Sequence, residues 1–157
     1  MSQAAFEALL FETAGTRYLT RLDTLDEVLM PVELQTLTGA PPFLRGVMSL
    51  RGEVLPVIAL AERLGAEVRD AWQRGNRILK VTSGPHAYGV VVDAIGRIQP
   101  VDAAAAEAPV LAEQAAVRFL GPLWRVEETL VQEIRLDALL DEEALAQLSR
   151  KQPRLAP

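Results

Sequence analysis

Apolar and polar residues alternate with a period of two in many short runs of this chain, and glycine, proline and small polar residues separate the runs. This period predicts β-strands that turn one face to a core, and the separating residues predict tight turns. Strands are expected at residues 10–13, 17–22, 32–37, 46–50, 53–58, 77–82, 87–92, 95–101, 117–120 and 130–136. Many short strands joined by such turns point to small antiparallel barrels.

Helical spacing is limited to a few stretches. Residues 22–29 fit either one helical turn or a bent strand, because Pro31 resists continuation of a helix. A brief helix is expected at residues 60–64, and leucines recurring opposite acidic residues predict a C-terminal helix over residues 136–148. Residues 102–116, rich in alanine and glutamate, are expected to form a crossing loop. The pattern as a whole indicates a mainly β fold with short helices.

The predicted hairpin over residues 46–58 is the most informative stretch. Its apolar residues flank Arg51 and Gly52, and glycine readily takes the positive φ that a tight reversal requires. Arg51 projects from this turn, where its guanidinium either stays hydrated or meets a partner. Taken alone, the residue favours the hydrated surface role, and its apolar neighbours fit a core.

Composition narrows the class of protein. The chain has 157 residues, which suits one domain, expected over residues 1–150 with a short tail at 151–157. With 21 acidic and 16 basic residues it carries no electrostatic footprint for nucleic acid. Cysteine is absent, and no run has the length and character of a membrane span or a cleaved leader. We therefore expect a cytoplasmic protein.

Candidate catalytic chemistry is sparse. The single histidine, His86, follows Gly84 and Pro85 in a predicted turn without a carboxylate at ligand spacing, so we expect a solvated turn residue. Asp93 follows a strand and is expected to bond nearby backbone amides. Acid pairs such as Glu127 with Glu128 are expected to cover solvated faces. The sequence therefore predicts no enzyme, no cofactor and no metal site.

The central hairpin also carries a family resemblance. Residues 43–58 read Phe-Leu-Arg-Gly-Val-Met-Ser-Leu-Arg-Gly-Glu-Val-Leu-Pro-Val-Ile, similar to the Gly-Val-x-Asn-Leu-Arg-Gly-x-x-x-Pro-Val signature of CheW-type chemotaxis adaptor domains. Residues 18–28, 88–93 and 120–140 resemble further family elements in the same order. The resemblance covers residues 10–148 and implies two SH3-like five-stranded barrels that share an apolar core. Residues 1–150 would then form a single CheW-like domain made of two barrel subdomains.

The resemblance also implies a function and a site. Proteins of this family are non-enzymatic scaffolds that join the tip of a methyl-accepting chemoreceptor to the regulatory domain of a CheA-type histidine kinase. Arg51 matches the family arginine implicated in this coupling, and Leu25 matches an apolar position near the receptor-facing groove. With Val47, Leu50 and Gly52, these are the expected partner-binding residues. The expected location is the cytoplasm at membrane-associated receptor arrays, without insertion into the membrane.

Several positions depart from the family pattern and leave the partner open. Ser49 replaces the usual asparagine, Ala59 and Ala61 fall where an Asp-Leu-Arg run is common, and Gln132 and Glu133 lie in a normally apolar strand. An accessory adaptor in a chemotaxis-like array for pilus twitching or gliding fits these changes.

One alternative function belongs to another class, a small β-barrel that binds an oligonucleotide, sugar or metabolite. The 5% aromatic content weighs against it, because base stacking needs aromatic side chains. An enzyme ranks last, because no nucleophile is accompanied by a base.

Overall fold

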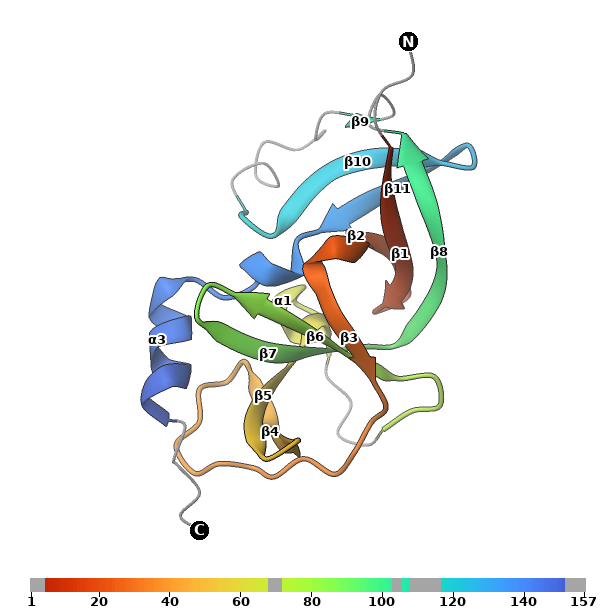
Figure 1. The fold of residues 1–157 in the computed structure, drawn as a ribbon. Coiled ribbons are helices and arrows are strands. Elements are labelled where there is room, and N and C mark those ends of the chain that lie inside the picture. Colours follow the sequence, from red (N-terminus) through yellow and green to blue (C-terminus); the bar gives the residue numbers. More distant parts are fainter. Residues whose placement is uncertain (1–4, 68–71, 103–105, 108–116, 152–157) are drawn as a thin grey trace.

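The computed structural model describes residues 5–67, 72–102, 106–107 and 117–151, and its strands form two bent sheets that pack together (Figure 1). Sheet A has the strand order β8-β1-β2-β11-β10-β9, and sheet B has the order β3-β6-β7-β5-β4. The strands are β1 (Ala5–Thr13), β2 (Thr16–Arg21), β3 (Leu25–Leu29), β4 (Leu44–Leu50), β5 (Glu53–Ala59), β6 (Arg77–Ser83), β7 (His86–Val92), β8 (Ala94–Asp102), β9 (Ala106–Glu107), β10 (Leu120–Val126) and β11 (Thr129–Ile134). The helical elements are η1 (Leu22–Thr24), α1 (Leu60–Arg63), η3 (Leu136–Ala138) and α3 (Glu142–Lys151). The predicted mainly β fold of two packed five-stranded units is confirmed, with the two-residue β9 added at the edge of sheet A.

The two sheets repeat one arrangement. Each contains two antiparallel hairpins joined through a parallel pair, β2 with β11 in sheet A and β7 with β5 in sheet B. Each is completed by an edge strand that arrives from the other sheet. The strand β3 follows the sheet A hairpin β1–β2 but pairs in sheet B, and β8 follows the sheet B hairpin β6–β7 but pairs in sheet A. This exchange of edge strands ties the two sheets together.

Tight turns close several of the hairpins. Arg51 and Gly52 both have positive φ, at 51° and 84°, and Glu127 and Glu128 have φ values of 49° and 67°. Two consecutive residues of this kind form the turn whose twist matches that of paired strands. Glycine adopts this conformation without steric cost, as predicted at Gly52, whereas the glutamates adopt it against their intrinsic preference.

Two strand predictions are wrong in detail. Residues 32–37 form no strand, because this segment crosses the edge of β4 and pairs there only between Gln35 and Val47. The expected strand at residues 117–120 is a turn, and β10 begins at Leu120 and continues through Gly121 and Pro122. A shift of register between Leu120 and Leu123 accommodates the proline, whose missing N–H prevents regular pairing.

The helical elements lie close to where the sequence predicts helical turns. Residues 22–29 contain both of the expected forms, because η1 makes one short turn before β3 begins. The predicted helix at residues 60–64 is α1, and Gly65 follows it with φ of 77°. The predicted C-terminal helix divides into η3 and α3. Most of the expected loop at 102–116, and residues 152–157 of the expected tail, lie outside the described residues.

Buried apolar residues of the described chain form a core inside each sheet and a larger core between them. The sheet A core includes Leu19 and Val131, and the sheet B core includes Val57 and Ile78. The shared core takes side chains from both sheets and from the C-terminal helical elements: Leu9, Phe11, Ile58, Leu60, Leu79, Val81, Tyr88, Val90, Val92, Phe119, Ile134, Leu136, Leu139, Leu140 and Leu148. The predicted sharing of one apolar core is thus observed.

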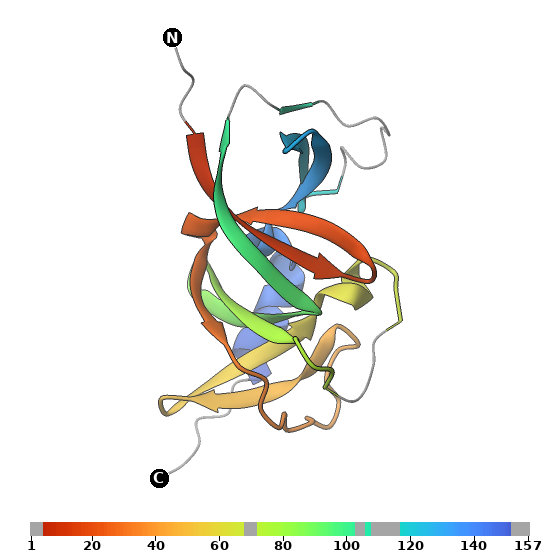
Figure 2. The same cartoon turned by 90° about the vertical axis from the view of Figure 1, so that its right-hand side faces the viewer.

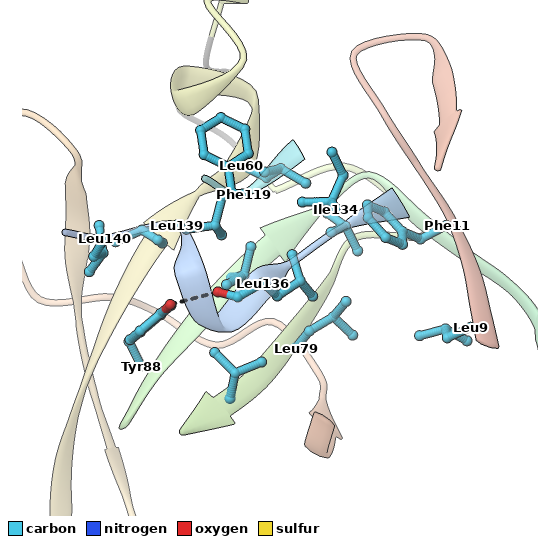
Figure 3. Packing of buried hydrophobic residues seen from close by; sticks show 14 of the residues in the cluster. Leu9, Phe11, Leu60, Leu79, Tyr88, Phe119, Ile134, Leu136, Leu139 and Leu140 are labelled. Carbon is cyan, nitrogen blue, oxygen red and sulfur yellow. Dashed lines mark hydrogen bonds between the residues drawn. The ribbon is translucent and has the colours of Figure 1, made fainter. Parts of the chain in front are cut away.

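Tyr88 is the polar anchor of this shared core (Figure 3). Its hydroxyl donates a hydrogen bond of 2.6 Å to the carbonyl oxygen of Leu136. Burial raises the pKa of the Tyr88 phenol, and the negative charge of Asp137 raises it further. The phenol therefore remains a neutral donor that fixes the start of η3 against sheet B.

Candidate functional site

The hairpin of β4 and β5 extends from the body of the protein and carries the expected partner-binding arginine at its turn (Figure 2). Arg51 and Gly52 are both exposed. Arg51 and Gly52 both have left-handed backbone conformation, and together they make the reversal of the hairpin.

Arg51 does not project freely into solvent. Its guanidinium forms a two-contact ion pair with the carboxylate of Glu27 on β3, through Nη2 to Oε1 and through Nη1 to Oε2 at 3.4 Å. The side chains are 65% and 30% exposed, so the arginine retains a large accessible surface. Because β3 and β4 are the opposite edge strands of sheet B, the pair links the hairpin turn to the far edge of the sheet.

This ion pair makes the surface sensitive to acid. The hydrogen bond and charge of Arg51 lower the pKa of Glu27, and Glu27 in turn raises the pKa of Arg51. A carboxyl group whose pKa is lower in the folded than in the unfolded protein stabilises the fold fully above its unfolded-state pKa. That stabilisation is lost as the pH falls through the folded-state pKa.

We expect NMR titration of Glu27 to show a midpoint below the ordinary glutamate value, and we expect Arg51→Ala to move this midpoint upward. An unchanged midpoint in that variant would contradict the ion pair.

The remaining expected residues occupy different environments around this pair. Leu25 lies two residues before Glu27 on β3 and packs, half buried, against the shared core. Leu50 packs against the sheet B core just before the turn. Val47 is half buried, and its backbone forms both hydrogen bonds of the bridge with Gln35, each 2.9 Å. The structure thus groups Leu25, Leu50 and the turn around the ion pair, whereas Val47 lies beside the segment that crosses β4.

That crossing segment, residues 30–43, is fixed by close packing. A Cβ on Gly46 would lie 2.8 Å from Cβ of Leu34, so only glycine permits this approach. The indole N–H of Trp72 donates 3.0 Å to the carbonyl oxygen of Val32, and the Arg45 guanidinium lies 4.5 Å from the centre of the Trp72 ring. The segment therefore forms a fixed border of the candidate surface.

Sequence reasoning missed the acidic partner of Arg51. A helical turn over residues 22–29 would point Glu27 outward together with Asp26, but in β3 Glu27 is half buried like Leu25 and Leu29, whereas Asp26 and Val28 are exposed. The sequence could have shown this, because in a strand over residues 25–29 alternate side chains share a face, and Glu27 then lies on the same face as Leu25 and Leu29.

The other candidate residues make contacts within the fold. The Asp93 carboxylate accepts a hydrogen bond of 2.9 Å from the backbone N–H of Ala14. Asp93 thus bonds a backbone amide, but one that is 79 residues away in the chain and not the nearby amide that was expected, and the bond joins two hairpins. Trp124 is 4% exposed and Trp72 is half buried beneath Arg45, so neither indole presents an open face for base stacking.

Among the described residues, no group of three His, Cys, Asp or Glu side chains is arranged to hold a metal ion. No described helix has the length and apolar character needed to cross a membrane.

Comparison with known proteins agrees with this architecture. Residues 7–144 match the family described as the CheW-like domain. The chain is 25% identical over 143 residues to the probable chemotaxis protein CheW of Rhizobium etli, covering 90% of this chain and 92% of that protein. It is 23% identical over 141 residues to the chemotaxis protein CheW of Klebsiella aerogenes, covering 89% and 84% of the two chains. The crystal structure of the scaffolding protein TtCheW from Thermoanaerobacter tengcongensis resembles its fold, with a TM-score of 0.79, 24% identity, and coverage of 90% of this chain and 96% of that one.

Proposed function

The chain belongs to the CheW-like domain family, a family of chemotaxis scaffolds, and from this premise we propose that it couples a chemoreceptor to a CheA-type histidine kinase. In this proposal it catalyses no reaction. It acts on the cytoplasmic side, at membrane-associated receptor arrays, by holding the regulatory domain of the kinase and the receptor tip at once.

The observation that carries the proposal is the geometry of Arg51. Its guanidinium is 65% exposed although it is held by Glu27, so it is both oriented and accessible. An oriented guanidinium loses less conformational entropy on binding than a free side chain, and it keeps donors for a carboxylate or carbonyl of a partner. We propose that Arg51 and Gly52, with Leu50 behind them, form the contact with the kinase.

The apolar edge beside this turn supports a receptor contact. Val28 on β3 is 44% exposed, and Met30 and Val32, which follow it, are 62% and 42% exposed. Exposed apolar side chains on one border suit the apolar face of an amphipathic helix. We propose that the helical receptor tip lies against this border and Leu25.

The experiment that tests the proposal is a charge reversal at the turn. We expect Arg51→Glu to weaken binding of a receptor-tip fragment or of the kinase regulatory domain by about tenfold or more, equivalent to about 1.4 kcal/mol. Arg135→Glu, at an exposed arginine beyond β11, is the matched control and should bind normally. Isothermal titration calorimetry measures binding, and circular dichroism with thermal melting verifies the fold. Unchanged binding of both partners by a folded Arg51→Glu variant would refute the assignment.

A further inference from the structure

The segment that crosses β4, residues 30–43, carries exposed apolar residues of the proposed receptor border, Met30 and Val32. It runs from the end of β3 to the start of β4 without forming a strand or a helix (Figure 1). Its backbone pairs with β4 only at Gln35, through two hydrogen bonds of 2.9 Å with Val47. Both exposed residues precede that bridge in the chain, so the bridge alone does not fix their part of the segment.

Trp72 attaches the segment at one of these exposed residues. Its indole N–H donates a hydrogen bond of 3.0 Å to the backbone carbonyl oxygen of Val32. The Arg45 guanidinium lies 4.5 Å from the centre of the indole ring, and the ring also packs against the sheet B core. These ring contacts aim the N–H at the carbonyl oxygen. The attachment uses the backbone of Val32, and the residue stays 42% exposed.

A second set of hydrogen bonds holds the backbone that carries Trp72. The N–H of Gln73 donates 2.7 Å to Oδ1 of Asn76, and Nδ2 of Asn76 donates 3.1 Å to the carbonyl oxygen of Asp93. Asn76 is only 5% exposed, so water competes little for these bonds. The Asp93 carboxylate in turn accepts from the N–H of Ala14 in the β1–β2 hairpin. Trp72 is thus anchored to the junction of the two sheets and not to the segment that it holds.

We infer that Trp72 is a positioning residue for the receptor contact. By holding the backbone of Val32, it keeps Met30 and Val32 together with Val28, near the end of β3, as one apolar border. A border that is ordered before binding loses less conformational entropy when a helix of the receptor tip lies on it. This inference rests on the proposed function, because it assigns Trp72 a role at the proposed receptor border.

The geometry assigns Trp72 to one partner only. The proposed kinase contact is centred on Arg51, whose guanidinium is held by Glu27 on β3, and that ion pair does not involve residues 30–43. Loss of the Trp72 attachment should therefore weaken receptor binding and leave kinase binding unchanged. A residue that merely stabilised the fold would affect both partners alike.

Trp72→Phe tests the attachment, because phenylalanine keeps an aromatic ring for Arg45 and the core but lacks the N–H donor. We expect it to weaken binding of a receptor-tip fragment by about three- to tenfold in isothermal titration calorimetry, with binding of the kinase regulatory domain within about twofold of wild type. Trp124→Phe is the matched control, because it removes the indole N–H that donates to Glu133 in sheet A. This control should melt at a lower temperature but bind the receptor fragment normally while folded.

A second variant displaces the segment from the side of β4. A Cβ on Gly46 would lie 2.8 Å from Cβ of Leu34 and 3.0 Å from the carbonyl oxygen of Gln35. Because β4 is held by its ladder with β5, the segment must shift to make room. Gly46→Ala should therefore reproduce the selective loss of receptor binding that Trp72→Phe causes.

Hydrogen exchange in the free chain measures the attachment without any partner. The N–H of Gln35, which donates to Val47, should exchange at least about threefold faster in Trp72→Phe, because the segment then opens more often. Unchanged exchange at Gln35, receptor binding equal to wild type, or an equal loss of kinase binding would each overturn the inference. A wild-type chain that does not bind the receptor fragment would instead refute the proposed receptor contact itself, and with it the role of Trp72 in binding.

Discussion

Replacing Arg21 with alanine is expected to lower the free energy of unfolding by about 2–3 kcal/mol, because it leaves the carboxylate of Glu133 buried beside one remaining donor. The expected loss of stability is smaller than the loss typical when one partner of a fully buried ion pair is removed. The reason is that the Arg21 side chain is 41% exposed, although the Glu133 side chain is only 3% exposed. Urea unfolding monitored by circular dichroism measures the change.

The contacts around Glu133 explain why the charge is tolerated inside sheet A. Nε of Arg21 lies 3.3 Å from Oε2, and the indole N–H of Trp124 donates 2.9 Å to Oε1. The guanidinium is also 4.0 Å from the centre of the Phe6 ring, whose edge meets Trp124. Gly121 leaves room for the carboxylate, because a Cβ there would lie 3.0 Å from Cβ of Glu133. Removing Arg21 therefore removes both a charge partner and a ring contact.

Two controls separate the buried charge from general effects of losing an arginine. Arg17→Ala, at an exposed position on the same strand, should change stability little. Adding Glu133→Gln to Arg21→Ala should recover part of the loss, because the amide oxygen still accepts from Trp124 and carries no charge. If Arg21→Ala unfolds at the same urea concentration as wild type, the ion pair contributes nothing to the fold.

The hairpins were predictable from the sequence because their signals are local. Alternation with a period of two and glycine at a turn require no knowledge of the rest of the chain, and the hairpin around Arg51 and Gly52 follows from them. Residues 32–37 show the limit of the same rule. Their alternation is as regular, but a strand also needs a parallel or antiparallel neighbour along its length, and this segment touches β4 only at Gln35.

The charged pairs were less predictable because their partners are distant in the chain. Glu133 was noted as a departure from a normally apolar strand, but its compensation by Arg21 depends on the parallel contact of β2 and β11. Glu127 was expected to be a solvated surface acid. It is exposed, and its partner Arg97 is brought to it by the crossing of β8 into sheet A. Sequence spacing contains no information on these partners until the pairing of the strands is known.

Gly89→Ala is expected to destabilise the fold by about 2 kcal/mol through overpacking. Gly89 is buried on β7, and a Cβ there would lie 2.6 Å from Cγ2 of Ile78, which is itself fully buried. Side-chain atoms of Leu55 and Val57 would lie 3.5 Å from the added Cβ, at ordinary contact distance, so the clash that must be relieved is the one with Ile78. Because Val57 pairs with Gly89 in the parallel ladder of β5 and β7, the strain reaches the hairpin that carries Arg51.

Sheet A shows that this pair of positions needs one large and one small residue. Its positions equivalent to Gly89 and Ile78 are Leu19 and Ala8, both in the core of that sheet, so the large and the small residue stand in opposite order in the two sheets.

A substitution at Ile78 should therefore relieve the strain that Gly89→Ala introduces. Ile78→Leu removes the methyl branch at Cγ2 and retains the volume, and alone it should cost less than about 1.5 kcal/mol. Combined with Gly89→Ala, it should give a loss smaller than the sum of the two single losses, measured by urea unfolding. Additive losses would show that the Gly89 side of β7 is restricted by the backbone and not by the branched side chain of Ile78.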